Sequence, residues 1–349
     1  MQTIAPEPVS CEPSEKTATR ARLSIIIEWA NTLLNGTPRA KLLFDILARQ
    51  WDALIRHEYP PTLPSEACRF LDRLDPRVQI LIISGESLEN DIEQALRMQS
   101  PESFDLSIHV EQGLEYYPLK NFGAALANGD LLLFVDSDVL PEEGWFAHLL
   151  GSLHRPDVQV VCGQTFVVPD GVFASAFALA WTYDLRDDSG QLIQPTKFYA
   201  NNIAFRADVF RETGFAPLGR RSRGASSLLR KELARMGVCV WENRSARVGH
   251  PPPSSFRHMA VRALAHGRDH YMKESEGRTV SGLRRSVSVA AARLGRGFVR
   301  TFRCWRQVGL RIWELPAVLA IISAYYGFFA LGGLFTHVSP NGMGSRFRV

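Results

Sequence analysis

Short apolar runs that alternate with helix-like segments constrain the fold of this chain more than any other feature of its sequence. Strand-like runs occupy 23–27 (LSIII), 78–83 (VQILII), 130–135 (DLLLFV) and 158–166 (VQVVCGQTF). Segments between them carry apolar or alanine residues at helical spacing, at 39–55, 92–98 and 121–128. Buried strands separated by helices are typical of a mostly parallel sheet with helices on its faces. The sequence therefore predicts an α/β fold.

Weaker signals extend this pattern toward the C-terminus. We expect short strands at 106–110, 198–205 and 238–241, and helices at 173–181 and 228–236. Gly237 follows the last of these helices at a common position for a helix C-terminal stop.

Two aspartates, Asp136 and Asp138, directly follow the run 130–135. In open α/β sheets, ligands bind outside the carboxyl ends of the strands. Two carboxylates one residue apart can share Mg²⁺ or Mn²⁺, which leaves other coordination positions to substrate phosphates. Alternatively, Asp-Ser-Asp starts a turn into a helix that begins near Pro141.

The segment 120–145, KNFGAALANGDLLLFVDSDVLPEEGW, resembles the family-two glycosyltransferases, whose fold is called GT-A. The resemblance extends over about residues 23–255. It implies that Asp136 faces the nucleotide ribose and that Asp138 binds a Mn²⁺ or Mg²⁺ ion bridging the diphosphate. Lys120 and Asn121 would flank the nucleotide.

Other matches to the family lie on both sides of this motif. LSIIIEWAN, at 23–31, is similar to the first strand and nucleotide-contacting turn, which makes Glu28 and Asn31 donor-binding candidates. His250 resembles a late histidine that completes the metal or diphosphate site, although a lone histidine can also be structural. The block 201–215 resembles the acceptor side. The acceptor-binding candidates are Trp181, Asn201 and Asn202.

The chain also departs from the family pattern at two places. Where the family usually has an aspartate pair after the second strand, this chain has SGES. We therefore expect Glu28 or Glu86 to recognise the nucleobase of the donor. Where an inverting enzyme has a Glu-Asp pair that supplies the general base, this chain has Ala225 and Ser226, and serine cannot remove a proton unaided.

Two explanations for the missing base remain open. Another carboxylate could take the role, the candidates being Asp184, Asp187, Asp188 and Glu232. Alternatively, the acceptor is a phosphate, which is already ionised and could be held by RRSRG at 220–224, a run that could equally be a solvated loop. The QxxRW signature of processive synthases is absent from the sequence, which favours transfer of a single sugar.

The C-terminal third differs in character from the rest. Leu294, Phe298, Phe302 and Trp305 recur at helical spacing among arginines, which predicts a basic amphipathic helix on an anionic membrane surface. The following 315–335 has no charged residue and is long enough to span the hydrocarbon core, which argues against nucleic acid as the partner. A buried core hairpin is the alternative. The arginines predict that the catalytic domain is cytoplasmic, at the cell inner membrane.

We therefore divide the chain into five parts. They are a disordered leader (1–21), a GT-A domain (22–256), a basic amphipathic helical segment (257–313), a transmembrane helix (314–336) and a tail (337–349). The five cysteines form no metal-binding cluster in the sequence, and we expect them to be reduced thiols.

The sequence predicts a metal-dependent, inverting glycosyltransferase. Its substrates would be a nucleotide-diphosphate sugar and a glycan or lipid-linked acceptor at a membrane lipid surface. The alternative is a nucleotide-sugar-binding relative without catalysis, which would act in a glycan-assembly complex. A nucleotidyl- or phosphotransferase is a third possibility, but the only glycine in ANTLLNGTPRA (30–40) is Gly36, so no Gly-rich phosphate loop follows the first strand.

Overall fold

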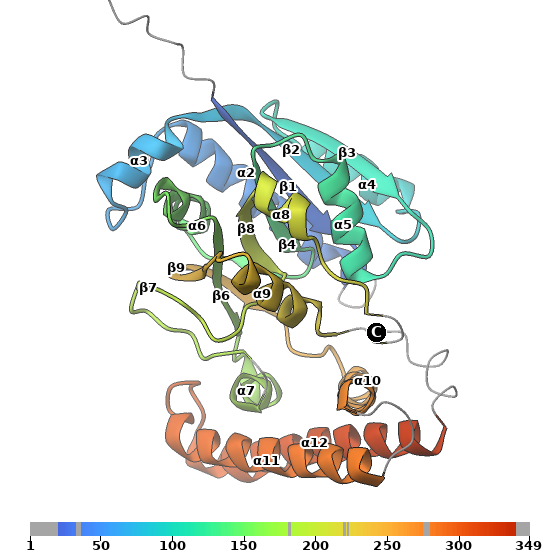
Figure 1. Cartoon of the computed structure of the whole chain (residues 1–349). Coiled ribbons are helices and arrows are strands. Elements are labelled where there is room, and N and C mark those ends of the chain that lie inside the picture. Colours follow the sequence, from blue (N-terminus) through green and yellow to red (C-terminus); the bar gives the residue numbers. More distant parts are fainter. Residues whose placement is uncertain are drawn as a thin grey trace, which may run out of the picture.

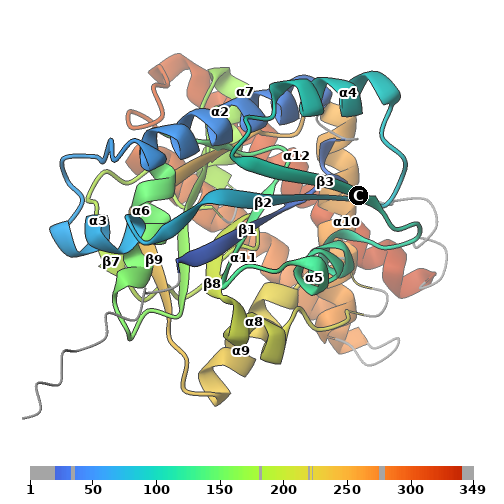
Figure 2. The same cartoon turned by 90° about the horizontal axis from the view of Figure 1, so that it is seen from above.

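A mixed β-sheet forms the centre of the molecule, with helices on both faces (Figures 1 and 2). The structure is a computed structural model that describes residues 20–32, 36–180, 183–218, 221, 223–274 and 280–339. The strands in these ranges are β1 (Ala21–Glu28), β2 (Leu74–Ser84), β3 (Phe104–Val110), β4 (Leu131–Asp136), β5 (Leu140–Pro141), β6 (Val160–Val167), β7 (Leu192–Ile193), β8 (Asn202–Arg206) and β9 (Val240–His250).

The strand order in the described sheet is β3-β2-β1-β4-β8-β6-β9-β5, with β7 paired to β9. Strands β1 to β4 are parallel to their neighbours in this set. Strand β8 is antiparallel to both β4 and β6, and β9 is parallel to β6. Strands β1, β2, β4, β6 and β9 therefore all point the same way and end at one edge of the sheet. The predicted α/β fold, a mostly parallel sheet flanked by helices, is confirmed.

The period-two alternation of the strands explains the two sides of the sheet. Ile25, Ile80 and Leu133 face one core, which is covered by α2 (Thr37–Ile55), α4 (Asn90–Gln99) and α6 (Trp145–Gly151), with α3 (Ser65–Leu71) beside α6. Ile26 and Leu132 face the other core, which is covered by α5 (Tyr116–Leu126), α8 (Ala207–Thr213) and α9 (Ala225–Arg235).

A separate layer of helices forms the third core and lies below the sheet in Figure 1. It consists of α7 (Gly171–Ala180), α10 (Phe256–Glu274), α11 (Val280–Cys304) and α12 (Leu315–Val338). Strand β6 leads into α7 and β9 leads into α10. The edge of the sheet at which the parallel strands end therefore adjoins this helical layer.

Helices α11 and α12 form an antiparallel pair (Figure 1). Arg293 lies over the ring of Phe329, while the later Gly297 faces the earlier Ile322. Later residues of α11 therefore contact earlier residues of α12, so the two helices run in opposite directions. We call these two helices the C-terminal hairpin.

The structure differs from the sequence prediction in this region. The predicted basic amphipathic segment is divided into two helices, α10 and α11, followed by a short 3₁₀ turn at Ile312–Glu314. Strand β9 is also longer than the predicted strand 238–241, because its second half pairs with β6 along Gln164–Val167. Residues 1–19 of the predicted leader (1–21), most of the tail and Trp181 lie outside the described residues, while Ala21 already belongs to β1.

Glycines allow the helices of the third core to approach closely. A Cβ atom built on Gly332 of α12 would lie 2.1 Å from the carbonyl oxygen of Leu264 in α10. A Cβ atom on Gly267 of α10 would lie 1.8 Å from the carbonyl oxygen of Phe329. Since backbone atoms cannot move aside as side chains do, larger residues at these positions would separate α10 from α12.

Gly332→Ala should lower the free energy of unfolding by about 1–3 kcal/mol because of this overpacking. Gly327→Ala is the matched control in the same helix, since no heavy atom lies within 4 Å of its added Cβ. It should be neutral or stabilising by up to about 1 kcal/mol. Thermal unfolding of the full chain in one detergent compares the two, and equal stability would contradict the close packing of α10 and α12.

Candidate active site

Three buried carboxylates gather where β1 and β4 end. Glu28 and Asp136 are register partners in these parallel strands, and Asp138 follows in the next turn. All three are at most 3% exposed. Because water cannot solvate them, these carboxylates need cations or hydrogen-bond donors close by.

Helix α5 supplies the donors that hold Asp136. The ammonium group of Lys120 lies 2.7 Å from Asp136 Oδ1, and Lys120 is completely buried. The hydroxyl of Tyr116 donates to the same carboxylate at 2.8 Å, and the amide of Asn31 donates to its other oxygen at 3.1 Å. Asn31 also binds the carboxylate of Glu28, through its backbone N–H and its side chain. Glu28, Asn31, Lys120 and Asp136 are therefore one hydrogen-bonded cluster.

The cluster has an excess of negative charge. Burial raises the pKa of Glu28 well above its usual value, and neighbouring Asp136 raises it further. Burial also raises the pKa of Asp136, while Lys120 opposes that rise. Lys120 is one positive charge against the two carboxylates of the cluster, so a further cation would be favoured here.

Asp138 and His250 face each other across the sheet edge. His250 Nε2 lies 3.9 Å from Asp138 Oδ2, and both side chains are buried. The other ring nitrogen of His250 lies 2.6 Å from the carbonyl oxygen of Pro251. Since a carbonyl can only accept, Nδ1 carries the proton and Nε2 is directed at the carboxylate. Burial lowers the pKa of His250 to about 3, so the ring is neutral and Nε2 has a lone pair.

A neutral imidazole nitrogen facing a carboxylate is a donor pair that suits Mn²⁺ and related divalent ions. The residues therefore fit the metal expected from the sequence. The described residues contain no group of three or more His, Cys, Asp and Glu side chains that could hold an ion. A metal at this pair would therefore need oxygen ligands from water and substrate phosphates.

Arg39 is a residue of this region that the sequence analysis missed. Its guanidinium group donates to the backbone carbonyl of Asp138 and, at 2.8 Å, to that of Gly249. It thereby fixes the turn that carries Asp138 against the end of β9. Tyr116 was also missed. Neither residue lies in a motif, and only the fold brings them to the carboxylates.

Two other donor-side candidates lie apart from the cluster. Glu86 is exposed just after β2. The side chain of Asn121 accepts from the backbone N–H of Phe215 at 2.9 Å and donates to its carbonyl at 2.8 Å. These bonds tie α5 to the segment after α8, so the amide of Asn121 serves the fold.

The structure also describes the acceptor-side candidates Asn201 and Asn202. Asn201 accepts from the hydroxyl of Thr165 at 3.0 Å, and its carbonyl accepts from the backbone N–H of Asp136. Asn202 is buried; it accepts from Trp145 Nε1 and donates to the carbonyls of Gln164 and Ala246. The predicted acceptor contact of Asn202 is therefore replaced by bonds inside the core.

The base position is occupied by a serine in the first turn of α9. Ser226 Oγ lies 3.4 Å from the hydroxyl of Tyr117. Asp187 binds Arg244, and its pKa is lowered chiefly by backbone hydrogen bonding to Ser189. Asp188 binds Arg186 at 2.5 Å and is largely exposed. The hydrogen bonds and the ion pair of Asp187 make this aspartate a weaker proton acceptor than a free carboxylate.

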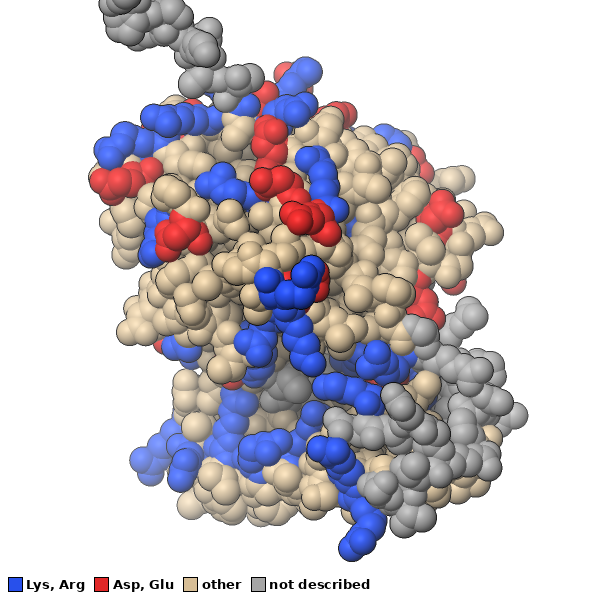
Figure 3. Space-filling model, viewed as in Figure 1, with Lys and Arg blue, Asp and Glu red and all other residues tan. Residues whose placement is uncertain are grey.

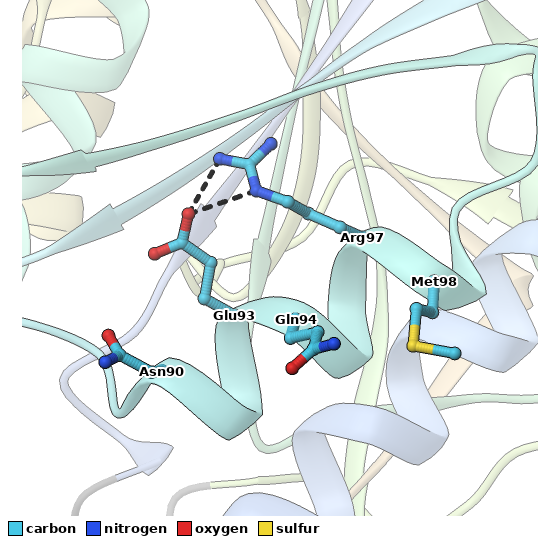
Figure 4. Close-up of a pocket in the computed structure, with 5 residues that line it drawn as sticks. All are labelled: Asn90, Glu93, Gln94, Arg97 and Met98. Atoms are coloured by element: carbon cyan, nitrogen blue, oxygen red, sulfur yellow. Dashed lines mark hydrogen bonds and ion pairs between the residues drawn. The ribbon is translucent and has the colours of Figure 1, made fainter.

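The remaining two carboxylate candidates are also paired. Asp184 binds Lys197 at 3.2 Å, and Glu232 binds Arg235 at 2.6 Å on the exposed side of α9. The depression shown in Figure 4 is a further surface feature, lined by Asn90, Glu93, Gln94, Arg97 and Met98. All five of its residues belong to α4, none is a predicted site residue, and the Glu93–Arg97 ion pair crosses it.

Residues 61–222 match the protein family described as Glycosyl transferase family 2. The chain contains a family 2 glycosyltransferase domain. The matched range includes Lys120, Asp136 and Asp138, whereas Glu28 and His250 lie outside it. The expected family is thereby confirmed.

A curated relative is the glucosyl-dolichyl phosphate glucuronosyltransferase of Haloferax volcanii. It is 26% identical over 194 residues, which cover 50% of this chain and 59% of the relative. The chain thus matches less than two thirds of that relative's length.

Two solved structures are similar at low sequence identity. Mannosyltransferase PcManGT from Pyrobaculum calidifontis, in complex with GDP-Man and Mn²⁺, has a TM-score of 0.49 and 12% identity, covering 93% of this chain and 89% of that one. GalNAc-T7 with UDP, GalNAc and Mn²⁺ has a TM-score of 0.47 and 13% identity, covering 74% and 52%.

Replacing Lys120 by Met should lower the free energy of unfolding by about 3–5 kcal/mol, because a buried carboxylate loses its cation. Without Lys120 the already raised pKa of Asp136 rises further. A carboxyl group whose pKa is higher in the folded than in the unfolded protein costs no stability at pH values below its unfolded pKa. The cost grows as the pH rises toward the folded pKa and is complete above it. The loss should therefore be larger at pH 8 than at pH 5.

Arg97→Met is the control for this experiment. It removes an exposed ion pair with Glu93 and should cost less than about 0.5 kcal/mol at both pH values. Denaturant unfolding at pH 5 and pH 8 measures both variants. A small loss for Lys120→Met that does not change with pH would contradict the dependence of the carboxylates on this lysine.

Proposed function

We propose that the protein is a metal-dependent, inverting glycosyltransferase that uses a nucleotide-diphosphate sugar as donor. The observation that carries this proposal is the Asp138–His250 pair, a nitrogen and an oxygen ligand held 3.9 Å apart beside the Glu28–Asp136 cluster. The family 2 domain that contains Asp138 supports the same activity.

Each group of the site has a distinct role in this proposal. Asp138 and His250 would hold Mn²⁺ or Mg²⁺, which neutralises charge on the leaving diphosphate when bound. Asp136 would accept from the nucleotide ribose, with Lys120 and Tyr116 fixing its orientation. Glu28 lies on the neighbouring strand, where Asn31 orients it toward the same ligand. Asn201 is the remaining acceptor-side candidate, beside the end of β4.

A second candidate function is a nucleotide-sugar-binding protein without catalysis, acting in a glycan-assembly complex. Ser226 at the base position favours it, because a serine hydroxyl cannot remove a proton unaided. The two functions share the donor site, so they differ in turnover and not in nucleotide binding.

Calorimetric titration with UDP, GDP and TDP, each with and without Mn²⁺, tests the donor site. One nucleotide should bind in a metal-dependent manner, and Asp138→Ala should remove the metal dependence. Turnover should fall by at least about 10²-fold, because the leaving diphosphate loses its electrostatic stabilisation. Asp157→Ala is the control, an exposed aspartate paired with Arg155, and should leave both quantities unchanged. Metal-dependent binding that survives in Asp138→Ala would refute the proposed ligand, and binding without turnover in the unaltered chain would favour the second function.

We infer also that the C-terminal hairpin attaches the protein to a membrane. The segment Ile312–Val338 is long and apolar enough to cross a bilayer, with a mean hydropathy of 1.9 in its most apolar window. Large apolar side chains are exposed near both ends of this segment, at Trp313 and at Leu331, Leu334, Phe335 and Val338. An apolar surface of this extent is typical of contact with lipid.

The packing of the hairpin favours a helix that lies in the membrane surface over one that crosses it. Arg293 of α11 lies beside Phe329 of α12, and Arg296 and Arg300 follow on the same helix. If α12 crossed the bilayer, its partner α11 would carry these arginines into the hydrocarbon core. Each arginine at the bilayer centre costs roughly 2.5–3.5 kcal/mol on insertion scales. In the membrane plane, the arginines instead reach the anionic headgroups.

Cysteine labelling distinguishes the two orientations. Cys239 is exposed on the catalytic side, and Ser339→Cys would place a second thiol at the end of α12. With a hairpin in the membrane plane, an impermeant maleimide should label both positions from the same side of sealed vesicles. A spanning helix would leave position 339 unlabelled until the vesicles are opened, and that result would refute the in-plane orientation. Peptide mass spectrometry assigns the labelled positions.

A further inference from the structure

A row of basic side chains lies on α10, between the candidate active site and the C-terminal hairpin. His258, Arg262 and His266 follow one another at intervals of four residues and therefore occupy one side of the helix. Figure 3 shows that lysine and arginine predominate over acidic residues in this lower part of the molecule. We call the three residues, together with Arg223 before α9, the α10 basic row.

Arg262 lies at the centre of this row and next to the active site. Burial lowers the pKa of His258, His266 and His250, and the positive charge of Arg262 lowers each of them further. Helix α10 begins at Phe256, shortly after β9 ends in His250, so the row lies beside the proposed metal ligands.

Two buried ring nitrogens of the row have no hydrogen-bond partner among the described residues, His258 Nε2 and His266 Nε2. The backbone N–H of Ser254 donates to His258 Nδ1 at 3.2 Å, so in the neutral ring Nε2 carries the proton. His266 is held at its other nitrogen by the hydroxyl of Tyr325 in α12. A buried N–H without an acceptor is costly, and an anionic oxygen would satisfy it.

Burial lowers the pKa of His266, and the positive charges of Arg223, Arg262 and Arg293 lower it further. Like charges gathered around one site repel one another, and a bound anion reduces that repulsion. Guanidinium groups match phosphate through parallel N–H donors. The row thus has the charge and the donors of a phosphate site.

We propose that the α10 basic row binds the phosphate of a lipid-phosphate acceptor, a prenyl phosphate monoester. This inference rests on the proposed glycosyltransferase function and names the acceptor of that site. Helix α10 packs on α12 through Gly267 and Gly332, so a lipid whose chain lies beside the hairpin has its phosphate near this helix.

A phosphate acceptor also accounts for Ser226 at the base position. A phosphate monoester is largely ionised at pH 7, with a second pKa of about 6. Its oxygen forms the bond to the anomeric carbon of the sugar while the bond from that carbon to the donor diphosphate breaks. The electron pair leaves with the nucleoside diphosphate, and no proton has to be removed.

The donor diphosphate is the competing source of phosphate, and Arg262→Gln separates the two. Binding of farnesyl phosphate to the full chain should weaken by at least about tenfold, as expected for the loss of a hydrogen bond to a charged group. Affinity for the nucleotide with Mn²⁺ should not fall, because Asp138 keeps its carboxylate for the metal and loses only a neighbouring positive charge. Arg257→Gln is the matched control, an exposed arginine in the first turn of α10, and should change neither value. Arg262→Lys should retain part of the farnesyl phosphate affinity, and thermal unfolding checks that all variants are folded.

Each other outcome overturns the proposal. A parallel fall in nucleotide affinity would assign Arg262 to the donor, and equal affinity of the unaltered chain for farnesyl phosphate and farnesol would exclude a phosphate site. Sugar transfer to hydroxyl acceptors but not to farnesyl phosphate would refute the phosphate as attacking group. Failure of the proposed function is distinguishable, because it shows as the absence of nucleotide binding while the Arg262-dependent binding of farnesyl phosphate persists.

Discussion

The buried ion pair between Lys120 and Asp136 is the interaction on which the candidate site depends. Glu28, Asp136 and Asp138 lie where water is excluded, and ionised carboxylates are strongly disfavoured there without a counter-charge. Lys120 supplies one internal cation from α5. This helix packs on the face of the sheet to which β4 contributes Leu132 and Phe134. One lysine against two carboxylates leaves the cluster with net negative charge, and that imbalance favours the divalent ion that we propose at its edge.

The antiparallel strand β8 is the second constraint. Because β8 reverses the direction between β4 and β6, the later strands β6 and β9 run parallel to β4. His250 at the end of β9 therefore reaches the edge that carries Asp138, and Arg39 ties the two strand ends together. If only one of the two pairings of β8 were antiparallel, β9 would run the other way and place His250 at the opposite edge.

The helical layer connects this edge to the C-terminal hairpin. Helix α10 begins directly after β9 and packs on α12 through close glycine contacts. Tyr183 forms a further connection, since its ring packs against His250 and its carbonyl accepts from Arg300 of α11. In the proposed arrangement, the donor approaches from the sheet and a lipid acceptor from the hairpin. The two would meet at α10, which follows β9 in the chain and packs on α12.

By itself, the sequence determined the strands β1, β2 and β4, the helices α2 and α4, the second half of α5, and the carboxylates at the strand ends. These features depend on local periodicity and on residue types that follow a strand directly, so neighbouring residues are sufficient to predict them. It also indicated Lys120 and His250, but only through resemblance to a family.

Only the tertiary structure decided which side chains meet. Tyr116 and Arg39 reach the aspartates from distant helices, and Asn202 is used inside the core. The basic residues of α10 lie beside the active site because that helix follows β9, which ends at the same edge of the sheet. Such contacts depend on the order and direction of strands far apart in the chain, which no local pattern of residues encodes.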